Sequence, residues 1–112
     1  SALRTAITED GDTMIGSTDL EIDLTARTVK KNKELLKLTL TEYSLLALLA
    51  SNEGKGLTHQ YLLRAIWGPG FISQSQYLRV FVAQLRKKIE TDANRPAHII
   101  TESRVGYRFI AK

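Results

Sequence analysis

The chain has 112 residues, of which 43% are apolar and 25% charged, a composition typical of one globular domain with its own core. No apolar run approaches the roughly 20 residues of a membrane span, no secretory signal pattern is present, and the lack of cysteine excludes disulfide scaffolds and thiol chemistry. The net charge of +4 is unevenly distributed, because residues 1–56 hold 7 Lys/Arg and 9 Asp/Glu, whereas residues 57–112 hold 9 and 3. The basic C-terminal half favours a polyanionic partner, although solubility alone would also explain it.

The N-terminal third predicts a tail followed by a small sheet. Residues 1–12 are polar and without a period, which predicts a linker or tail before one domain at 13–112. Leu20, Ile22 and Leu24 alternate with acidic residues, which is the period of a strand with one wet face. With the strands expected around Val29 and in 35–38, residues 13–38 predict an antiparallel sheet of four strands.

Two helices are expected next. Thr39-Leu40-Thr41-Glu42 has the form of a capping box, and the leucine-rich run after it ends at the turn 52–56. Thr58 is a second N-cap, before a shorter helix that Gly68-Pro69-Gly70 stops.

A third, longer helix begins after a cap at Ser73 or Ser75 and runs to about Glu90. Its apolar residues recur at helical spacing and predict one buried stripe, formed by Leu78, Val82, Leu85 and Ile89. Further core positions are expected at Leu45, Leu46, Leu49, Leu62 and Ile66. His98–Thr101 and Tyr107–Ile110 then predict a β-hairpin with a cationic tip, in which His98 is expected at the surface.

The predicted order defines an α+β fold: a winged helix-turn-helix with an N-terminal four-stranded antiparallel sheet, three helices and a C-terminal β-hairpin wing. A helix that buries one face and presents amide and cationic groups on the other suits the DNA major groove. A basic hairpin beside it suits the phosphate backbone or the minor groove.

The order and spacing of several short segments resemble the effector domain of OmpR/PhoB-type response regulators over about residues 13–111. The segments are 38–46, 57–68, Leu78-Arg79-Val80, 85–90, Ile100-Thr101 and Gly106-Tyr107-Arg108-Phe109. Within that family, Trp67-Gly68-Pro69, 75–79, Arg95-Pro96 and 100–102 resemble the branch that regulates potassium-uptake genes.

The chain departs from the family pattern at three places. Leu40 stands where proline is usual, and Ala83 and Gln84 stand where phosphate-sensing relatives carry arginines. Ser103-Arg104 replaces the usual Arg-Gly at the wing tip, so the minor-groove arginine is either displaced to Arg104 or lost.

The resemblance and the helix face together predict three groups of DNA contacts. Those expected at base edges are Arg79, Val80, Ala83, Gln84 and Lys87. Those expected at phosphates are Trp67, Gln76, Tyr77, Arg86, Thr101 and Tyr107. Those expected in the wing or minor groove are Ser103 and Arg104.

Each group has a structural alternative. The face of the third helix could be merely solvated, and Arg79 could form an ion pair within the protein. Trp67 and Tyr107 could be core residues, and Arg86 could pair with an acidic side chain.

The resemblance implies a cytoplasmic domain that binds double-stranded promoter DNA at direct repeats, one copy head-to-tail with a second. It also implies a receiver domain in the full-length protein, and the loop 68–75, with Phe71 and Ile72, as a contact for RNA polymerase unless these side chains pack the loop down. No cofactor, metal or enzymatic activity is expected, because no nucleophile–base pair, phosphate loop or ligand cluster is present. A winged helix used for protein–protein contact is the alternative function.

Overall fold

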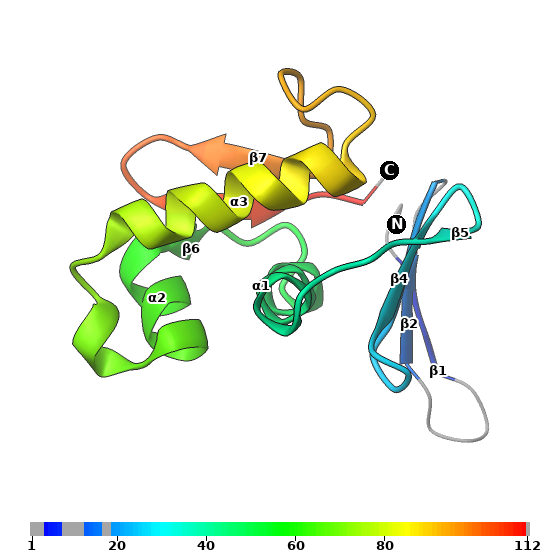
Figure 1. The fold of residues 1–112 in the computed structure, drawn as a ribbon, viewed down its shortest axis with the longest axis horizontal. Coiled ribbons are helices and arrows are strands. Elements are labelled where there is room, and N and C mark those ends of the chain that lie inside the picture. The colour runs from blue at the N-terminus through cyan, green and yellow to red at the C-terminus, as the bar shows by residue number, and fades with distance from the viewer. Residues whose placement is uncertain (1–3, 8–12, 17–18, 112) are drawn as a thin grey trace.

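The computed structural model describes residues 4–7, 13–16 and 19–111. Figure 1 shows an N-terminal antiparallel sheet at one end of the molecule, three helices beside it and a second small sheet that packs along the longest helix. This is the predicted α+β winged-helix architecture. None of the helices in these ranges is long and apolar enough to cross a membrane.

The N-terminal sheet has five strands rather than the predicted four. The strands are β1 (Arg4–Ile7), β2 (Thr13–Gly16), β3 (Leu20–Asp23), β4 (Thr28–Lys31) and β5 (Glu34–Leu35), paired antiparallel in chain order. β1 lies in the segment predicted as a tail, because its backbone pairs with β2, from Arg4 opposite Gly16 to Ile7 opposite Thr13. β5 is shorter than expected, since the chain leaves the sheet after two pairs to reach the next helix.

Two of the three helices begin where the capping signals place them. In α1 (Leu40–Ser51) the capping box is complete: Glu42 N donates to Thr39 Oγ1 at 3.2 Å, and Thr39 N donates to Glu42 Oε1 at 2.9 Å. α2 (His59–Trp67) is capped by Thr58, and a 3₁₀ turn, η1 (Pro69–Phe71), follows it. α3 (Ser75–Ile89) starts after Gln74 without a side-chain cap, so neither Ser73 nor Ser75 plays the predicted role.

The predicted hairpin is part of a three-stranded sheet. β7 (Ile99–Glu102) and β8 (Gly106–Phe109) form the wing, and β6 (Leu57–Thr58), which the sequence analysis missed, pairs with the other edge of β8. Since β6 immediately precedes α2, this pairing ties the wing to the start of the helix-turn-helix unit. Gly106 lies opposite Thr58 at a close backbone approach: a Cβ there would be 1.9 Å from the Leu57 carbonyl oxygen.

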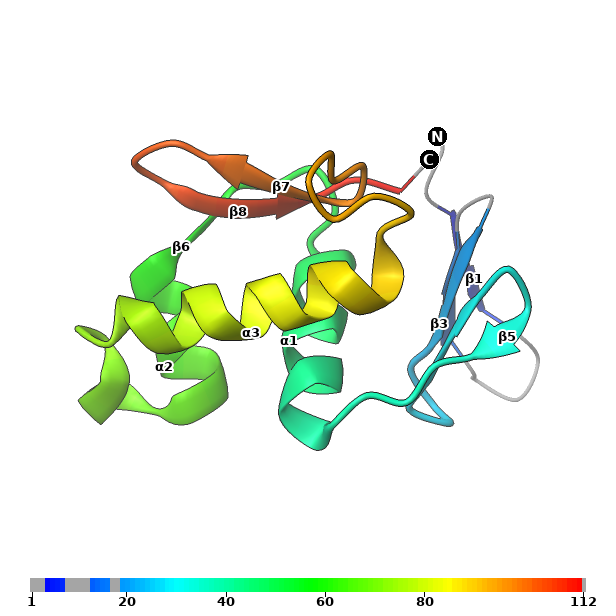
Figure 2. The ribbon, with the colours of Figure 1, turned by 45° about the horizontal axis from the view of Figure 1, so that its top comes forward.

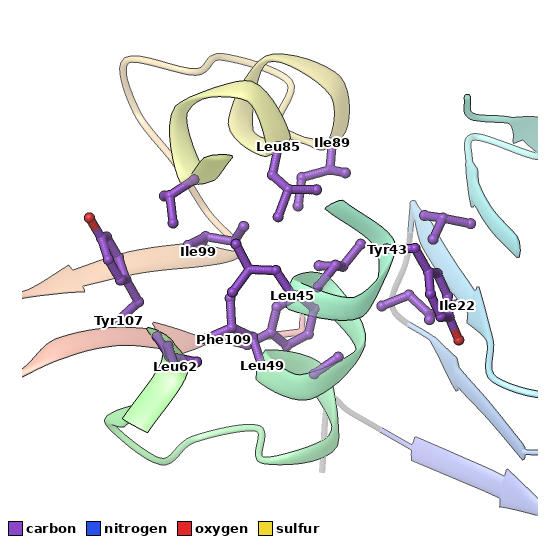
Figure 3. Close-up of a cluster of buried hydrophobic side chains, with 14 of the residues drawn as sticks. Ile22, Tyr43, Leu45, Leu49, Leu62, Leu85, Ile89, Ile99, Tyr107 and Phe109 are labelled. Atoms are coloured by element: carbon purple, nitrogen blue, oxygen red, sulfur yellow. The ribbon is translucent and has the colours of Figure 1, made fainter. Parts of the chain in front are cut away.

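The core lies between α1, α3 and the wing sheet. Figure 3 shows Leu85 and Ile89 of α3, Leu45 and Leu49 of α1, and Phe109 of β8 converging on one cluster. Every predicted core residue is buried except Ile66, which is partly buried. Figure 3 also shows Tyr43 of α1 against Ile22 of β3, which is how the N-terminal sheet joins the same core.

Polar contacts also fasten the N-terminal sheet to the end of α3 and to the wing. Lys31 Nζ donates to the Ile89 carbonyl at 2.5 Å and to Asp19 Oδ2 at 3.1 Å. His98 is buried rather than at the surface, because its ring nitrogens lie 3.1 Å from Asp19 Oδ1 and 2.9 Å from the Ile110 carbonyl. Three segments distant in sequence therefore meet at Asp19.

The domain is expected to lose stability in acid through Glu42 and Asp19. Burial raises the pKa of Glu42, but hydrogen bonds from Lys88 and from the Thr39 amide outweigh it, so the pKa lies below its ordinary value of 4.5. Burial likewise raises the pKa of Asp19, and hydrogen bonds from Lys31 and His98 lower it to a net value below 3.8. A depressed carboxyl pKa contributes stability that is complete above the unfolded-state pKa and is lost as pH falls through the folded-state pKa.

Thermal unfolding from about pH 6 to about pH 3 measures this loss. At pH values lower than about 4.5 we expect the melting temperature to decrease. The decrease should be less steep in Glu42→Gln, which keeps an oxygen for the Thr39 amide but loses the charge. Equal pH dependence in the two proteins would contradict a role for Glu42.

Candidate nucleic-acid interface

One face of α3 is exposed and free of acidic side chains. Six exposed side chains recur three or four residues apart along about 16 Å of helix, which places them on one face. They are Gln76, Arg79, Val80, Ala83, Gln84 and Lys87, hereafter the α3 outer row. The opposite face carries the four fully buried residues Leu78, Val82, Leu85 and Ile89. The five residues predicted at base edges therefore share one accessible surface with Gln76.

Two cationic side chains flank the α3 outer row, and both form hydrogen bonds with other groups of the protein. On one flank, Arg86 Nη2 donates to the Ile99 carbonyl and to Thr101 Oγ1, both at 2.8 Å. On the other flank, Lys88 Nζ donates to the buried Glu42 carboxylate of α1 at 2.6 Å. Arg86 thus holds a carbonyl and a hydroxyl of the wing, where the sequence analysis offered a phosphate or an acidic side chain.

Aromatic side chains fill the turn between α2 and α3. The Trp67 ring packs against Phe81 at 5.2 Å and Tyr77 at 6.3 Å between centroids, and Phe71 lies 5.7 Å from Tyr77. Trp67 is partly buried by these contacts, which support its alternative as a packing residue. Ile72 remains exposed at 38%, so the loop 68–75 presents apolar surface there even though Phe71 packs against Tyr77.

The wing places its cationic residue at the tip of the hairpin. Ser103 and Arg104 lie in the turn that the bond from Val105 N to Glu102 O closes, and both are exposed. Arg104 has φ +67°, a left-handed conformation that glycine adopts more easily, and the family resemblance implies glycine at this position. Figure 2 shows the tip at the same end of the molecule as the N-terminal half of α3, away from the N-terminal sheet.

Thr101 and Tyr107 face each other across the two wing strands but differ in exposure. Thr101 is exposed, whereas Tyr107 is 5% exposed and lies edge-on to His59 with ring centroids 5.4 Å apart. In Figure 3 the Tyr107 hydroxyl points away from the core cluster. Its ring therefore packs in the interior, the alternative given above, and only its hydroxyl could reach a ligand.

Glu90 is an organising residue of this surface that the sequence analysis did not single out. Its buried carboxylate accepts hydrogen bonds from the backbone N–H groups of Ala97, His98 and Ile99 at 2.8–3.1 Å. It thereby joins the end of α3 to the first residues of the wing. Nothing local in the sequence indicates this contact, because a glutamate at a helix end is ordinarily exposed.

The described residues hold no group of three or more His, Asp or Glu side chains placed to bind a metal ion. What they do hold is an acid-free amide and cationic helix face, with a basic hairpin tip next to it.

Comparison with known proteins defines the class. Residues 32–109 match the family described as "Transcriptional regulatory protein, C terminal". The chain belongs to this family and is a DNA-binding output domain of the OmpR/PhoB response-regulator type.

The chain is similar to three proteins of known name or structure. The chain is 42% identical over 107 residues to the KDP operon transcriptional regulatory protein KdpE of Escherichia coli K12, covering 96% of this chain and 48% of the relative, so it spans about half the length of that protein. Its fold is similar to the RstA DNA-binding domain of Klebsiella pneumoniae in complex with the RstA box (TM-score 0.79, 28% identity, 87% of this chain and 96% of that one). It is also similar to the response regulator DrrB of Thermotoga maritima (TM-score 0.75, 33% identity, 88% and 44%).

Proposed function

We propose that this domain binds a promoter element sequence-specifically, with the α3 outer row against base edges in the major groove. The observation that carries the proposal is the row itself, six exposed side chains on one face without an acid among them. Gln84 can read adenine through paired hydrogen bonds, Arg79 and Lys87 can read guanine, and Val80 and Ala83 suit the thymine methyl group.

Phosphate contacts on both sides of the groove would fix the register without reading sequence. The exposure of Gln76, Tyr77 and Thr101 supports them in this role. Trp67, Arg86 and Tyr107 make interior contacts, which support a role in holding the phosphate-facing surface in place. Arg104, with Ser103 beside it, would reach the backbone or the minor groove next to the site; the exposure of both side chains in the wing turn supports this.

The identity to KdpE supports a finer proposal about the whole protein. The domain would follow a receiver domain in a cytoplasmic two-component regulator of potassium-uptake genes. Two copies would bind direct repeats head-to-tail, and the apolar loop 68–75 would contact RNA polymerase. The single domain would bind weakly and with strong salt dependence, because the phosphate charge term then dominates.

Substitutions in the α3 outer row test the reading of bases. Fluorescence anisotropy with a duplex carrying a KdpE-type promoter repeat, against scrambled DNA, should show a preference for the repeat. Gln84→Ala should reduce that preference by about 1–3 kcal/mol, roughly 5- to 150-fold, since a lost bidentate pair costs this much. Lys87→Ala should likewise reduce the preference for the repeat, since Lys87 is proposed to read guanine.

Lys30→Ala is the matched control, because Lys30 is an exposed lysine on β4 of the N-terminal sheet and should leave affinity and salt slope unchanged. Equal binding of both duplexes with a steep salt slope would retain non-specific DNA binding and reject base reading. If the wild-type domain does not bind either duplex at low salt, the protein–protein module is favoured instead.

A further inference from the structure

Arg86 is the residue through which α3 holds the wing. Both Nε and Nη2 donate to the Ile99 carbonyl, at 3.2 and 2.8 Å, and Nη2 also donates to Thr101 Oγ1 at 2.8 Å. The guanidinium carbon lies 5.7 Å from the centre of the Tyr107 ring. One side chain thus contacts a backbone carbonyl, a hydroxyl and an aromatic ring.

These partners belong to both strands of the hairpin. Ile99 and Thr101 are on β7, and Tyr107 is on β8 directly opposite Thr101. The Tyr107 ring also lies edge-on to the ring of His59 at the start of α2. Arg86 therefore fixes the hairpin as a unit against the helix that carries the outer row, and Figures 1 and 2 both show β7 running alongside α3.

The hairpin tip is sensitive to this attachment. Arg104 comes three residues after Thr101 and projects from an exposed turn, beyond the last residue that Arg86 holds. Glu102, the last residue of β7, and the turn lie between Thr101 and Arg104, so a small rotation of the hairpin at Thr101 becomes a larger displacement at the tip. A rigid planar guanidinium with several donors resists such rotation, whereas a lysine ammonium on a flexible stem does not.

We propose that Arg86 is a positioning residue: it sets the wing relative to α3, so that Arg104 and the α3 outer row engage one DNA site together. This inference rests on the proposed function and deepens it. It assigns Arg86 to a contact within the protein that controls a second contact with DNA. The contact with DNA, at the backbone or in the minor groove, is then made by the wing tip.

Lys88, on the opposite flank of α3, provides the matched comparison. It also forms an ion pair within the protein, with Glu42 at 2.6 Å. This ion pair joins α3 to α1 and involves no residue of the wing. A conservative substitution at Lys88 therefore disturbs the helix on the side away from Arg104.

A double-mutant cycle on DNA affinity tests the proposal. In the wild-type domain, Arg104→Ala should weaken DNA binding by at least about fivefold, because one charged contact is lost. In an Arg86→Lys background the same substitution should weaken binding by less than about twofold, since the wing is already misplaced. In a Lys88→Arg background, Arg104→Ala should keep its full effect within about twofold. Circular dichroism melts confirm that each variant is folded. If Arg86→Lys does not fold, Thr101→Val, which removes one of the three hydrogen bonds and favours a strand, takes its place in the cycle.

The outcomes separate the inference from the function beneath it. An equal Arg104→Ala effect in both Arg86 backgrounds would overturn the inference while leaving DNA binding intact. A wild-type domain that is insensitive to Arg104→Ala would overturn it too, because the wing tip would then contribute nothing. No preference of the wild-type domain for the repeat over scrambled DNA would instead be a failure of the proposed function.

Discussion

Replacing Gly106 with alanine is expected to separate β6 from β8 and to lower the free energy of unfolding by about 3 kcal/mol or more. The added Cβ would lie 1.9 Å from the Leu57 carbonyl oxygen and 2.9–3.0 Å from the backbone carbons of Leu57 and Thr58. All three atoms are backbone, so no side-chain rotation relieves the overlap. One strand must move, and both flank the start of α2.

Urea unfolding of Gly106→Ala against the wild-type domain measures this loss. Gly70→Ala is the matched control, because a Cβ there meets nothing within 4 Å and the residue has no positive φ. We expect the control to stay within about 0.5 kcal/mol of the wild type. A Gly106→Ala domain as stable as the control would mean that β6 and β8 do not approach as closely as described.

Removing the Glu90 carboxylate should cost about as much. In Glu90→Ala the backbone N–H groups of Ala97, His98 and Ile99 all lose their acceptor, and a buried donor left unpaired costs about 1–3 kcal/mol. His98 and Ile99 are buried, whereas Ala97 is exposed and its amide can partly bond to water instead. We therefore expect a total loss of stability of about 3 kcal/mol. Amide hydrogen exchange at 97–99 should accelerate in the same variant.

Glu90→Gln gives a graded comparison, because its one carbonyl oxygen can still accept while its NH₂ group faces the remaining donors. Chemical denaturation should place this variant between the wild type and Glu90→Ala. If Glu90→Ala is within about 0.5 kcal/mol of the wild type, the three amides find other acceptors and Glu90 does not hold the wing.

The position of Glu90 also explains a local conflict. A carboxylate at the C-terminal end of a helix opposes the helix dipole, so the helix alone disfavours it. The three backbone amides that it accepts from compensate, and Lys31 of β4 donates to the adjacent carbonyl of Ile89. The end of α3 thus receives hydrogen bonds from residues of both sheets, Lys31 of β4 and Ile99 of β7.

The sequence was sufficient where the signal is local. The apolar period of α3 predicts which face is buried, so it also predicts which side chains remain available, as the structure confirms for exposure of the α3 outer row. The capping box at Thr39 depends on residues three apart and is present in full. The contacts of the outer-row side chains with DNA stay predictions.

Features formed by distant residues escaped the sequence analysis. β6 has only two residues and exists because β8 pairs with it from about fifty residues away. His98 was expected at the surface, because a histidine in a strand carries no period, yet its ring joins Asp19 to Ile110. Arg86 looks like part of a basic helix face, and only the position of β7 shows where its hydrogen bonds go.

The central claim is that the α3 outer row and the wing tip together form the DNA-binding surface. Titration of the ¹⁵N-labelled domain with the promoter-repeat duplex, followed by amide chemical shifts, tests it most directly. The largest changes are expected on the outer row, from Gln76 to Lys87, and on Ser103 and Arg104, with little change in β3 to β5. Changes centred on the N-terminal sheet, with α3 unaffected, would contradict it.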